Sequence, residues 1–326
     1  MGKLEIMKKV VVGIDVGGTN TEVGIVLMSG EIVARATMST QKYGADFNAY
    51  ISDLQSLIES LVSMDDDLQL MGIGIGAPNG NSREGTIEQA PNLQWIGVTP
   101  FCRILKTRFP NIPINLTNDA NAAAMGEVMF GAARGYSDFV SITLGTGLGS
   151  GIISGGKLID GHDGFAGEIG HTIVYPGGRE CGCGRFGCIE TYLSASGIVR
   201  TAFELMVKYK ASTILSNFSF STMTSKDVFD AAIQGDWLAR EVFAKSGEIL
   251  GLKLADIVAT LSPRAFFVVG GVARAGDLLL KPTRESMERN LLSIYKNKVK
   301  VLPSGLPGMD VAILGAAALV MSQRVE

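Results

Sequence analysis

An apolar run that breaks into glycines lies near the start of the chain and reads Lys9-Val10-Val11-Val12-Gly13-Ile14-Asp15-Val16-Gly17-Gly18-Thr19-Asn20. A second apolar run, residues 21–27, follows at once. Two such runs joined by a short turn are typical of a β-hairpin. A turn with bare backbone amides and a hydroxyl can surround phosphate oxygens, and a carboxylate at its edge can hold the water shell of a magnesium ion. The stretch therefore predicts a hairpin whose phosphate-binding candidates are Asp15, Gly17, Gly18, Thr19 and Asn20.

Two further glycine clusters follow apolar runs. Residues 139–144 lead into Gly145-Thr146-Gly147, which repeats the design of the first turn. Residues 265–269 lead into Gly270-Gly271, where the flat base of a nucleotide could lie against glycine backbone. Taken singly, a glycine turn after a strand indicates no more than an ordinary β-hairpin turn. Together, the clusters predict two phosphate turns, with Gly145, Thr146, Gly147, Gly270 and Gly271 on the nucleotide side.

Two other glycine-rich stretches do not match nucleotide motifs. Gly72-Ile73-Gly74-Ile75-Gly76 has the wrong spacing for a dinucleotide fingerprint and runs into Ala77-Pro78 instead of opening a helix. Residues 151–158 nearly match a P-loop, but Leu158 stands where that loop needs a serine or threonine for magnesium.

The pattern of apolar residues in the first part of the chain predicts a mixed sheet with covering helices. Strands are expected over residues 10–15, 22–28 and 32–38, followed by an amphipathic helix over about 45–64 and a strand over 70–75. An α/β fold is the expected product.

A carboxylate stands at the start of an expected helix in the middle of the first half. A short apolar strand from Ile114 ends at Asn118-Asp119, and an alanine-rich helix begins just after it. Asp119 therefore lies near the positive end of a helix dipole. By itself this position fits an ordinary helix cap as well as a functional carboxylate.

Ligand residues for a metal gather in two neighbouring segments, Glu168-Ile169-Gly170-His171 and Cys181-Gly182-Cys183-Gly184-Arg185-Phe186-Gly187-Cys188-Ile189-Glu190. His171, Cys181, Cys183 and Cys188 form a Cys3His set, which suits tetrahedral zinc and leaves no open position for a hydrolytic water. We expect a structural zinc that also holds Glu168 and Glu190 close together. A redox pair with a resolving cysteine, or a chance arrangement, are the alternatives.

Composition restricts the class of protein. The 326 residues are 46% hydrophobic and 19% charged, with a formal net charge of -3, so the chain can build sizeable cores and has no basic excess for a nucleic-acid partner. Four cysteines are too few for a disulfide scaffold. The sequence shows neither a secretory signal nor an apolar run long enough to span a membrane. We expect a cytoplasmic protein without a membrane partner.

These motifs occur in one order across most of the chain, and in that order they resemble the ROK family of sugar kinases and sugar-responsive repressors, most closely its bacterial glucokinase-like members. The resemblance spans roughly Val11 to Gly315. It implies an α/β fold of the actin-like ATPase type, in which two ribonuclease H-like domains face each other across an active-site cleft. The expected small domain comprises residues 1–118 and 311–326, with a last helix from Val311 to Gln323, and the expected large domain comprises residues 119–310 with the zinc knuckle.

The resemblance also implies residue roles and ligands. Asp119 is similar to the family's general base, which takes the proton from the sugar's 6-hydroxyl as that oxygen attacks the γ-phosphorus of ATP. Residues similar to those that bind the sugar hydroxyls are Asn118, Asp119, Glu168, His171 and Glu190, with Asn79 and Asn92 as candidates from the small domain. The implied cofactors are ATP with Mg²⁺ and a structural Zn²⁺, and the implied assembly is a homo-oligomer, dimer or tetramer.

The sugar is the least determined part of this expectation. Likeness to glucokinases favours glucose or a related hexose, whereas N-acetylmannosamine and N-acetylglucosamine kinases share the same histidine and cysteine motifs. A non-catalytic sugar-sensing regulator is a third reading. Repressors of the family add a DNA-binding segment before the first phosphate turn, and here only fourteen residues precede Asp15. The sequence therefore favours a kinase of carbohydrate metabolism and glycolysis.

Overall fold

The computed structural model describes residues 7–306 and 311–322, and the chain divides into two compact units. The first unit comprises residues 1–135, 158–166 and 305–326, and the second comprises residues 136–157 and 167–304. The predicted domains divide the chain elsewhere, at 118/119 and 310/311. Residues 1–6, 307–310 and 323–326 of those domains lie outside the described residues.

Helix α3 (Asp119–Met129) accounts for much of this difference in boundaries. It packs against α9 (Val311–Met321), and both helices belong to the first unit. Residues 158–166 also join the first unit, where the Asn81 side chain donates a hydrogen bond to the carbonyl of Asp163 at 3.0 Å. The chain therefore passes between the units more often than the predicted division requires.

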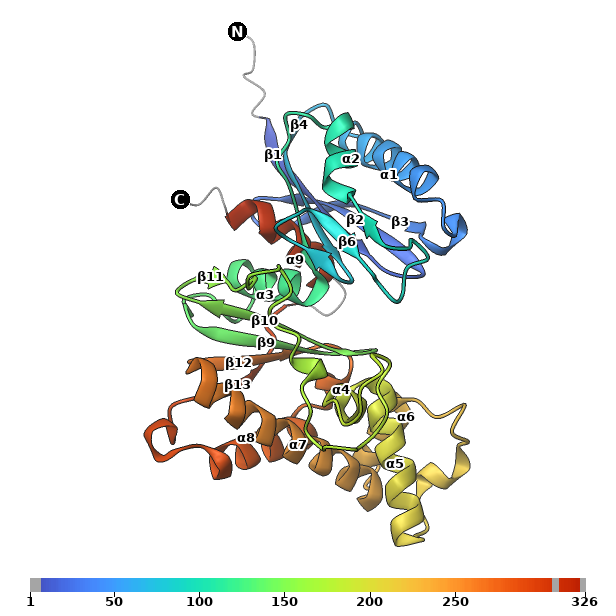
Figure 1. Cartoon of the computed structure of the whole chain (residues 1–326), viewed down its shortest axis with the longest axis vertical. Coiled ribbons are helices and arrows are strands. Elements are labelled where there is room, and N and C mark those ends of the chain that lie inside the picture. Colours follow the sequence, from blue (N-terminus) through green and yellow to red (C-terminus); the bar gives the residue numbers. More distant parts are fainter. Residues whose placement is uncertain (1–6, 307–310, 323–326) are drawn as a thin grey trace. The chain divides into compact units, whose positions relative to one another are not determined.

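A five-stranded mixed sheet forms the centre of the first unit (Figure 1). Its order is β3-β2-β1-β4-β8, in which β1, β2 and β3 are antiparallel and both β4 and β8 run parallel to β1. The predicted strands and hairpin are confirmed. The strand bounds are β1 (Lys8–Val16), β2 (Asn20–Leu27), β3 (Ile32–Ser39), β4 (Leu68–Ala77) and β8 (Ile114–Asn118).

Helices cover both faces of this sheet because side chains of a strand alternate between its faces. Val10, Val12 and Ile14 of β1 pack with α1 (Phe47–Val62) and α2 (Phe101–Arg108) on one face. Val11 packs with α9 on the other face. A smaller sheet of β5 (Gly80–Asn81), β6 (Thr86–Glu88) and β7 (Val98–Thr99) extends the same unit.

Glycines in the strands allow α9 to approach the sheet closely. A Cβ atom at Gly74 of β4 would collide with the carbonyl oxygen of Ala316, and one at Gly13 of β1 would collide with that of Ile313. The run Gly72 to Gly76 therefore has a packing role. Helix α9 begins at the predicted residue, Val311, while the predicted end, Gln323, lies outside the described residues.

The second unit repeats the strand order of the first. Its sheet has the order β11-β10-β9-β12-β13, with an antiparallel β9–β10 hairpin and with β12 and β13 parallel to β9. The predicted second hairpin is confirmed. The bounds are β9 (Phe139–Leu144), β10 (Leu148–Ser154), β11 (Lys157–Leu158), β12 (Ala265–Val269) and β13 (Lys300–Pro303).

Helices of the second unit enclose a large apolar core. The longest, α7 (Trp237–Leu261), lies beside α8 (Asp277–Asn290) in Figure 1, and Gly247 and Gly251 of α7 allow close contact with the α8 backbone. The other helices are α4 (Glu190–Leu193), α5 (Ala195–Tyr209) and α6 (Ser225–Ile233). Among the described helices of both units, none is long and apolar enough to cross a membrane.

Candidate functional site

Two carboxylates of the first unit lie at the carboxyl ends of β1 and β8, the two parallel strands on either side of β4. Asp15 lies near the end of β1 opposite Gly76 of β4, and Asp119 directly follows β8, whose last residue pairs with Ala77 of β4. The carboxyl ends of parallel strands are where α/β sheets place ligand-binding groups. The structure therefore brings together two acidic residues that the sequence predicted separately.

The charge on these residues is unfavourable without a cation. Desolvation by burial, followed by the charges of Asp119 and Glu22, raises the pKa of Asp15 to about 7. Desolvation by the surrounding protein raises the pKa of Asp119 too, although its side chain is exposed to solvent. Hydrogen bonds from backbone amides, with Ala120 the first, oppose that rise. Such a pair can hold a divalent cation, or one of its members can act as a proton acceptor.

The first glycine turn is fixed by its surroundings. The Gly17 amide donates to the carbonyl of Asn20 at 3.0 Å, and the Thr19 carbonyl accepts from the amide of Thr40 at 2.8 Å. A Cβ atom at Gly18 would collide with the carbonyl oxygen of Asn92. The turn thus touches a segment that the sequence assigned to the sugar.

A buried hydroxyl network, which the sequence reasoning missed, lies beneath this turn. The Thr21 hydroxyl is 2.8 Å from the hydroxyls of both Thr40 and Tyr50. Burial raises the pKa of Tyr50, so its hydroxyl stays protonated and can donate. Thr21 lies on β2, Thr40 directly after β3 and Tyr50 on α1, and hydroxyl residues so far apart give no sequence signal until the fold brings them together.

Asn79 and Asn118 lie in the same unit, after β4 and at the end of β8. Asn79 has a left-handed backbone with φ of 50°, which asparagine tolerates, and its amide donates to the carbonyl of Gln89 at 3.1 Å. Asn118 is the N-cap of α3, and its side-chain oxygen accepts from the Ala120 amide at 2.7 Å. Oδ1 of Asp119 accepts from the same Ala120 amide, also at 2.7 Å, so the two residues share the cap that the sequence allowed at Asp119.

The second glycine turn and the third glycine cluster meet in the second unit. The Gly145 amide donates to the carbonyl of Gly147 at 3.0 Å, which closes the turn between β9 and β10 around Thr146. Gly270 has φ of 105°, and a Cβ atom there would collide with the backbone of Leu144, directly before the turn. Gly271 follows as the cap of a short 3-10 helix, Val272–Ala275.

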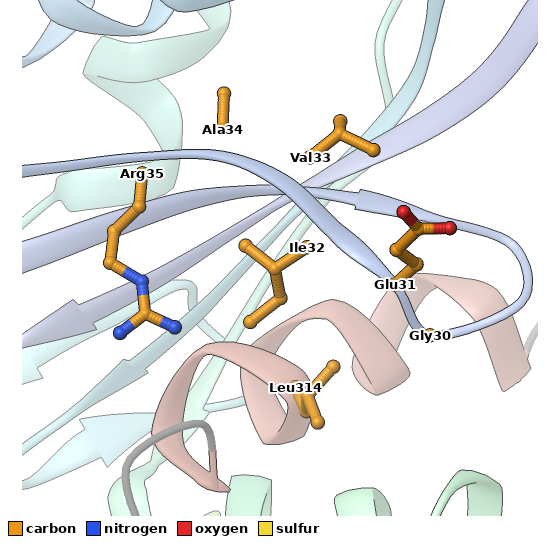
Figure 2. A pocket seen from close by; sticks show the side chains of 7 residues that line it. All are labelled: Gly30, Glu31, Ile32, Val33, Ala34, Arg35 and Leu314. Carbon is orange, nitrogen blue, oxygen red and sulfur yellow. The ribbon is translucent and has the colours of Figure 1, made fainter.

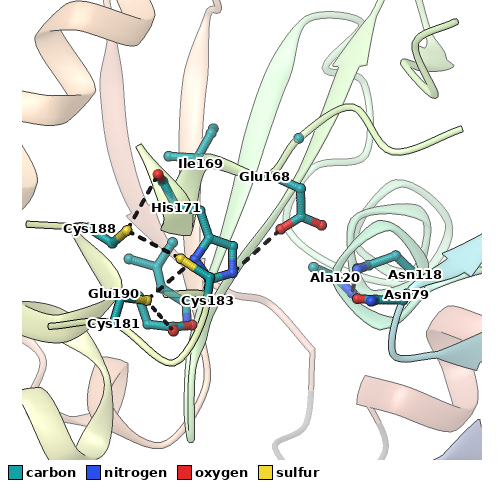
Figure 3. A network of polar contacts seen from close by, with 12 residues as sticks. Asn79, Asn118, Ala120, Glu168, Ile169, His171, Cys181, Cys183, Cys188 and Glu190 are labelled. Atoms are coloured by element: carbon teal, nitrogen blue, oxygen red, sulfur yellow. Dashed lines mark hydrogen bonds and ion pairs between the residues drawn. The ribbon is translucent and has the colours of Figure 1, made fainter. Parts of the chain in front are cut away.

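The four predicted metal ligands converge in the second unit (Figure 3). One ligand atom from each of His171, Cys181, Cys183 and Cys188 lies within 4.8 Å of every other. The Cys183 and Cys188 sulfurs are 3.7 Å apart, and the Cys181 sulfur is 3.6 Å from Nδ1 of His171. In a tetrahedral zinc site with Zn–S bonds of about 2.3 Å, sulfur atoms lie about 3.8 Å apart. The cluster therefore fits a zinc site, with Nδ1 as the histidine ligand.

The thiols of this cluster would bind a metal ion as thiolates. Burial raises the pKa of Cys181 to about 12 and raises that of Cys188 as well. Both groups would therefore stay neutral in the bare protein at neutral pH. A bound metal ion deprotonates its thiol ligands. Two isolated β-bridges in this loop, Ile173 with Cys188 and Glu180 with Phe186, hold the sulfurs in place.

Two carboxylates flank the cluster. Oε2 of Glu168 lies 4.0 Å from Nε2 of His171, on the ring nitrogen that faces away from Cys181. Oε1 of Glu190 lies 3.7 Å from the Cys181 sulfur, and its Oε2 accepts a hydrogen bond from the Leu148 amide at 2.9 Å. Figure 3 shows these side chains around the His171 ring. Glu168 therefore lies beside the histidine ligand of the cluster and Glu190 beside one of its cysteines.

Arg179 anchors the metal loop to the helix that follows it, and the sequence reasoning missed this residue. Its buried guanidinium donates to both carboxylate oxygens of Glu204, to the carbonyl of Thr191 and to the Thr201 hydroxyl. It also lies 4.3 Å from the centre of the Tyr192 ring. An arginine outside the cysteine motif carries no signal of this role in sequence.

A hollow of about 480 Å³ lies beside edge strand β3 (Figure 2). It is lined by Gly30, Glu31, Ile32, Val33, Ala34, Arg35 and Leu314. None of the predicted site residues is among them. One carboxylate and one guanidinium over aliphatic side chains do not form a set of groups for phosphate, sugar or metal.

Comparison with known proteins gives one consistent result. Residues 11–323 match the model of the ROK family. The chain is 37% identical to a glucokinase of Halalkalibacterium halodurans, covering 96% of this chain and 95% of that protein. It is 31% identical to a xylose repressor of Caldicellulosiruptor bescii, covering 99% of this chain and 81% of that protein. The crystal structure of a ROK family glucokinase from Streptomyces griseus, in complex with glucose and AMPPNP, superposes with a TM-score of 0.78 at 34% identity, covering 95% and 98% of the two chains.

Proposed function

The chain belongs to the ROK family and is a glucokinase-like ATP-dependent sugar kinase by homology, and we propose that it transfers the γ-phosphate of ATP to the 6-hydroxyl of glucose or a related hexose. The observation that carries the proposal is the match over residues 11–323, together with the intact Asp119 at the end of β8.

Asp119 acts as the general base in this proposal. Its exposed carboxylate can accept a proton. Its pKa is raised above the usual value for aspartate, which makes the carboxylate a stronger base. Asn118 and Asp119 share the cap of α3, so capping does not depend on the Asp119 side chain alone. The residue takes the proton of the sugar's 6-hydroxyl as that oxygen attacks phosphorus.

The glycine turns hold the phosphates of ATP. The turns at 17–20 and 145–147 are rich in glycine, so phosphate oxygens can approach their backbone closely, and Gly270 and Gly271 would offer a flat surface for the base. Phosphoryl transfer requires mainly alignment and charge neutralisation from the protein. Mg²⁺ supplies part of that neutralisation, and Asp15, whose pKa is raised to about 7 in the bare protein, is the carboxylate suited to its water shell.

Side-chain carboxylates and amides bind the sugar hydroxyls in this proposal. We assign this role to Asn79, Asn92, Asn118, Glu168, His171 and Glu190, in addition to Asp119. A structural zinc ion held by His171, Cys181, Cys183 and Cys188 would leave Nε2 of His171 protonated and fixed in direction. That nitrogen then donates to a sugar hydroxyl or to Glu168.

We further propose a cytoplasmic location, because thiols such as these stay reduced there. A homo-oligomer, dimer or tetramer, is our proposal for the assembly, and light scattering after size-exclusion chromatography measures it directly.

The experiment is a transfer assay with ATP and Mg²⁺ over glucose, mannose, fructose, N-acetylglucosamine and N-acetylmannosamine. We expect the highest kcat/KM with glucose, and 6-deoxyglucose, which lacks the accepting hydroxyl, is the matched inert control. A higher kcat/KM with an N-acetylated sugar would replace the hexose with the alternative substrate class. Absence of transfer to any sugar would contradict the proposal.

A further inference from the structure

One carboxylate of the second unit touches both the metal cluster and the second glycine turn. Glu190 is the first residue of α4, and its Oε1 lies 3.7 Å from the Cys181 sulfur. Its Oε2 accepts the amide hydrogen of Leu148, the residue that follows the turn, at 2.9 Å. A residue of the proposed sugar site therefore holds the backbone of the proposed nucleotide turn.

The glycine at position 147 makes this contact possible. A Cβ atom there would lie 2.5 Å from Oε2 of Glu190, so any side chain would push the carboxylate away. At Gly145, in the same turn, a Cβ atom would have no neighbour within 4 Å. The two glycines therefore differ in surroundings, although both belong to one turn and neither requires a left-handed backbone.

A second contact joins the same two segments. The amide of Ala195, five residues after Glu190, donates to the carbonyl of Gly145 at 2.8 Å. The segment from Glu190 to Ala195 thus holds the turn at both ends, once through a side chain and once through backbone. Movement of this segment must be transmitted to the turn, because packed protein is not freely deformable.

The contacts form a continuous row from one proposed sugar ligand to the nucleotide turn. The Glu168 carboxylate lies near Nε2 of His171, and Nδ1 of the same ring lies near the Cys181 sulfur. That sulfur in turn lies near the Glu190 carboxylate. Glu190 then bonds to Leu148. The first unit has a simpler equivalent, in which Gly18 lies against the carbonyl of Asn92.

Resting on the proposed function, we infer that Glu190 is a positioning residue shared by the two substrates, which couples sugar binding to the shape of the nucleotide turn. A sugar hydroxyl that donates to Glu190 fixes the carboxylate, and the carboxylate fixes the Leu148 amide and the turn before ATP arrives. Coupling between binding sites is reciprocal, so disturbing the turn at Gly147 weakens sugar binding and removing Glu190 weakens nucleotide binding.

The first test compares Gly147→Ala with Gly145→Ala. Calorimetry measures the Kd of glucose without nucleotide, so the turn has no phosphate to bind. We expect Gly147→Ala to raise this Kd by about fivefold or more, the lower end of common coupling effects, because the new methyl group displaces Glu190. Gly145→Ala adds the same methyl group to open space, and the Kd for glucose should stay near that of the wild type.

The reciprocal test uses AMPPNP with Mg²⁺ and no sugar. Glu190→Ala should raise the Kd of the nucleotide by about fivefold or more, although Glu190 is assigned to the sugar. Glu168→Ala removes the other sugar carboxylate, which reaches the turn only through His171, Cys181 and Glu190, and should change the nucleotide affinity less than Glu190→Ala does. This pair decides the matter even where Gly147→Ala fails to fold.

Unchanged sugar affinity in a folded Gly147→Ala, or unchanged nucleotide affinity in Glu190→Ala, would overturn the inference. If both variants of either pair lost affinity to the same extent, the inference would also be overturned, because the loss would then not depend on Glu190. A wild-type protein that binds no hexose contradicts the proposed function itself. That outcome is visible before any variant is measured.

Discussion

Asp15 and Asp119 lie at the carboxyl ends of two parallel strands, β1 and β8, with only β4 between them. After burial, the charge of Asp119 is the largest cause that raises the pKa of Asp15 to about 7. The bare protein therefore keeps two acidic groups close together. With neutral side chains at both positions, the folded protein would be more stable.

Asp15→Asn should make the protein without Mg²⁺ and nucleotide more stable at pH 8. The folded protein binds the Asp15 proton more tightly than the unfolded chain does, so the contribution of Asp15 to stability is largest below about pH 4 and falls as the pH rises through about 7. We expect a gain of about 1–2 kcal/mol, less than the full pKa shift implies because Asp15 is only half-buried. Calorimetric Tm at pH 8 and pH 4 measures this gain. Equal Tm values of the variant and the wild type at pH 8 would contradict the repulsion.

Kinase activity should fall at least about tenfold in the same variant.

Asp119→Asn should lower kcat by about 10²–10⁴-fold while sugar and ATP binding change by only a few fold. Asparagine can accept a helix-capping hydrogen bond but cannot take a proton. A residue that only capped α3 would therefore be rescued by asparagine and not by alanine. Near-normal kcat in Asp119→Asn would remove the residue from catalysis. In the wild type, kcat/KM should fall as the pH drops through the raised pKa of Asp119.

Cys183→Ser should release the metal. Purified wild-type protein should contain about one zinc per chain, and the variant should contain little, because one of four ligands is lost. Cys102→Ser is the matched control: Cys102 is a buried cysteine of the first unit outside the cluster, so zinc content should persist. Elemental analysis of both proteins decides. Wild-type protein free of zinc would restore the redox interpretation of the cysteines.

Arg179→Lys should loosen the metal loop. Lysine cannot reproduce the paired hydrogen bonds to Glu204 together with those to Thr191 and Thr201. We expect a loss of about 2–4 kcal/mol in stability, as for other broken buried networks, and faster zinc release to a chelator. Arg185→Lys changes an exposed arginine of the same loop and should have little effect. Similar Tm values for the two variants would show that the Arg179 network contributes little.

Regular patterns in the chain were sufficient to predict the framework. The strands at 10–15, 22–28 and 32–38 were located within two residues at each end, because alternating apolar residues and glycine turns are local signals. Helix α1 begins at Phe47, where the amphipathic period predicted about residue 45. The metal cluster was predicted because its four ligands are rare residues in close sequence.

Contacts between distant residues could not be predicted in the same way. From sequence, Gly147 belongs to the nucleotide side and Glu190 to the sugar side, and only the folded second unit places one against the other. Likewise, Gly72 to Gly76 could be excluded as a nucleotide motif, but its packing against α9 depends on residues near the other end of the chain. The roles of Asp119 and the other site residues stay predictions.

Helix α9 is the last described element, yet it covers a face of the sheet formed by the first strands, pressed against Gly13 and Gly74. On a ribosome, β1 and β4 leave the exit tunnel long before the helix that shields them. Most of the second unit, by contrast, is the continuous segment 167–304, which is complete while α9 is still being made. The unit that is synthesised first is therefore the one that finishes folding last, and its exposed strand face needs protection from aggregation in the meantime.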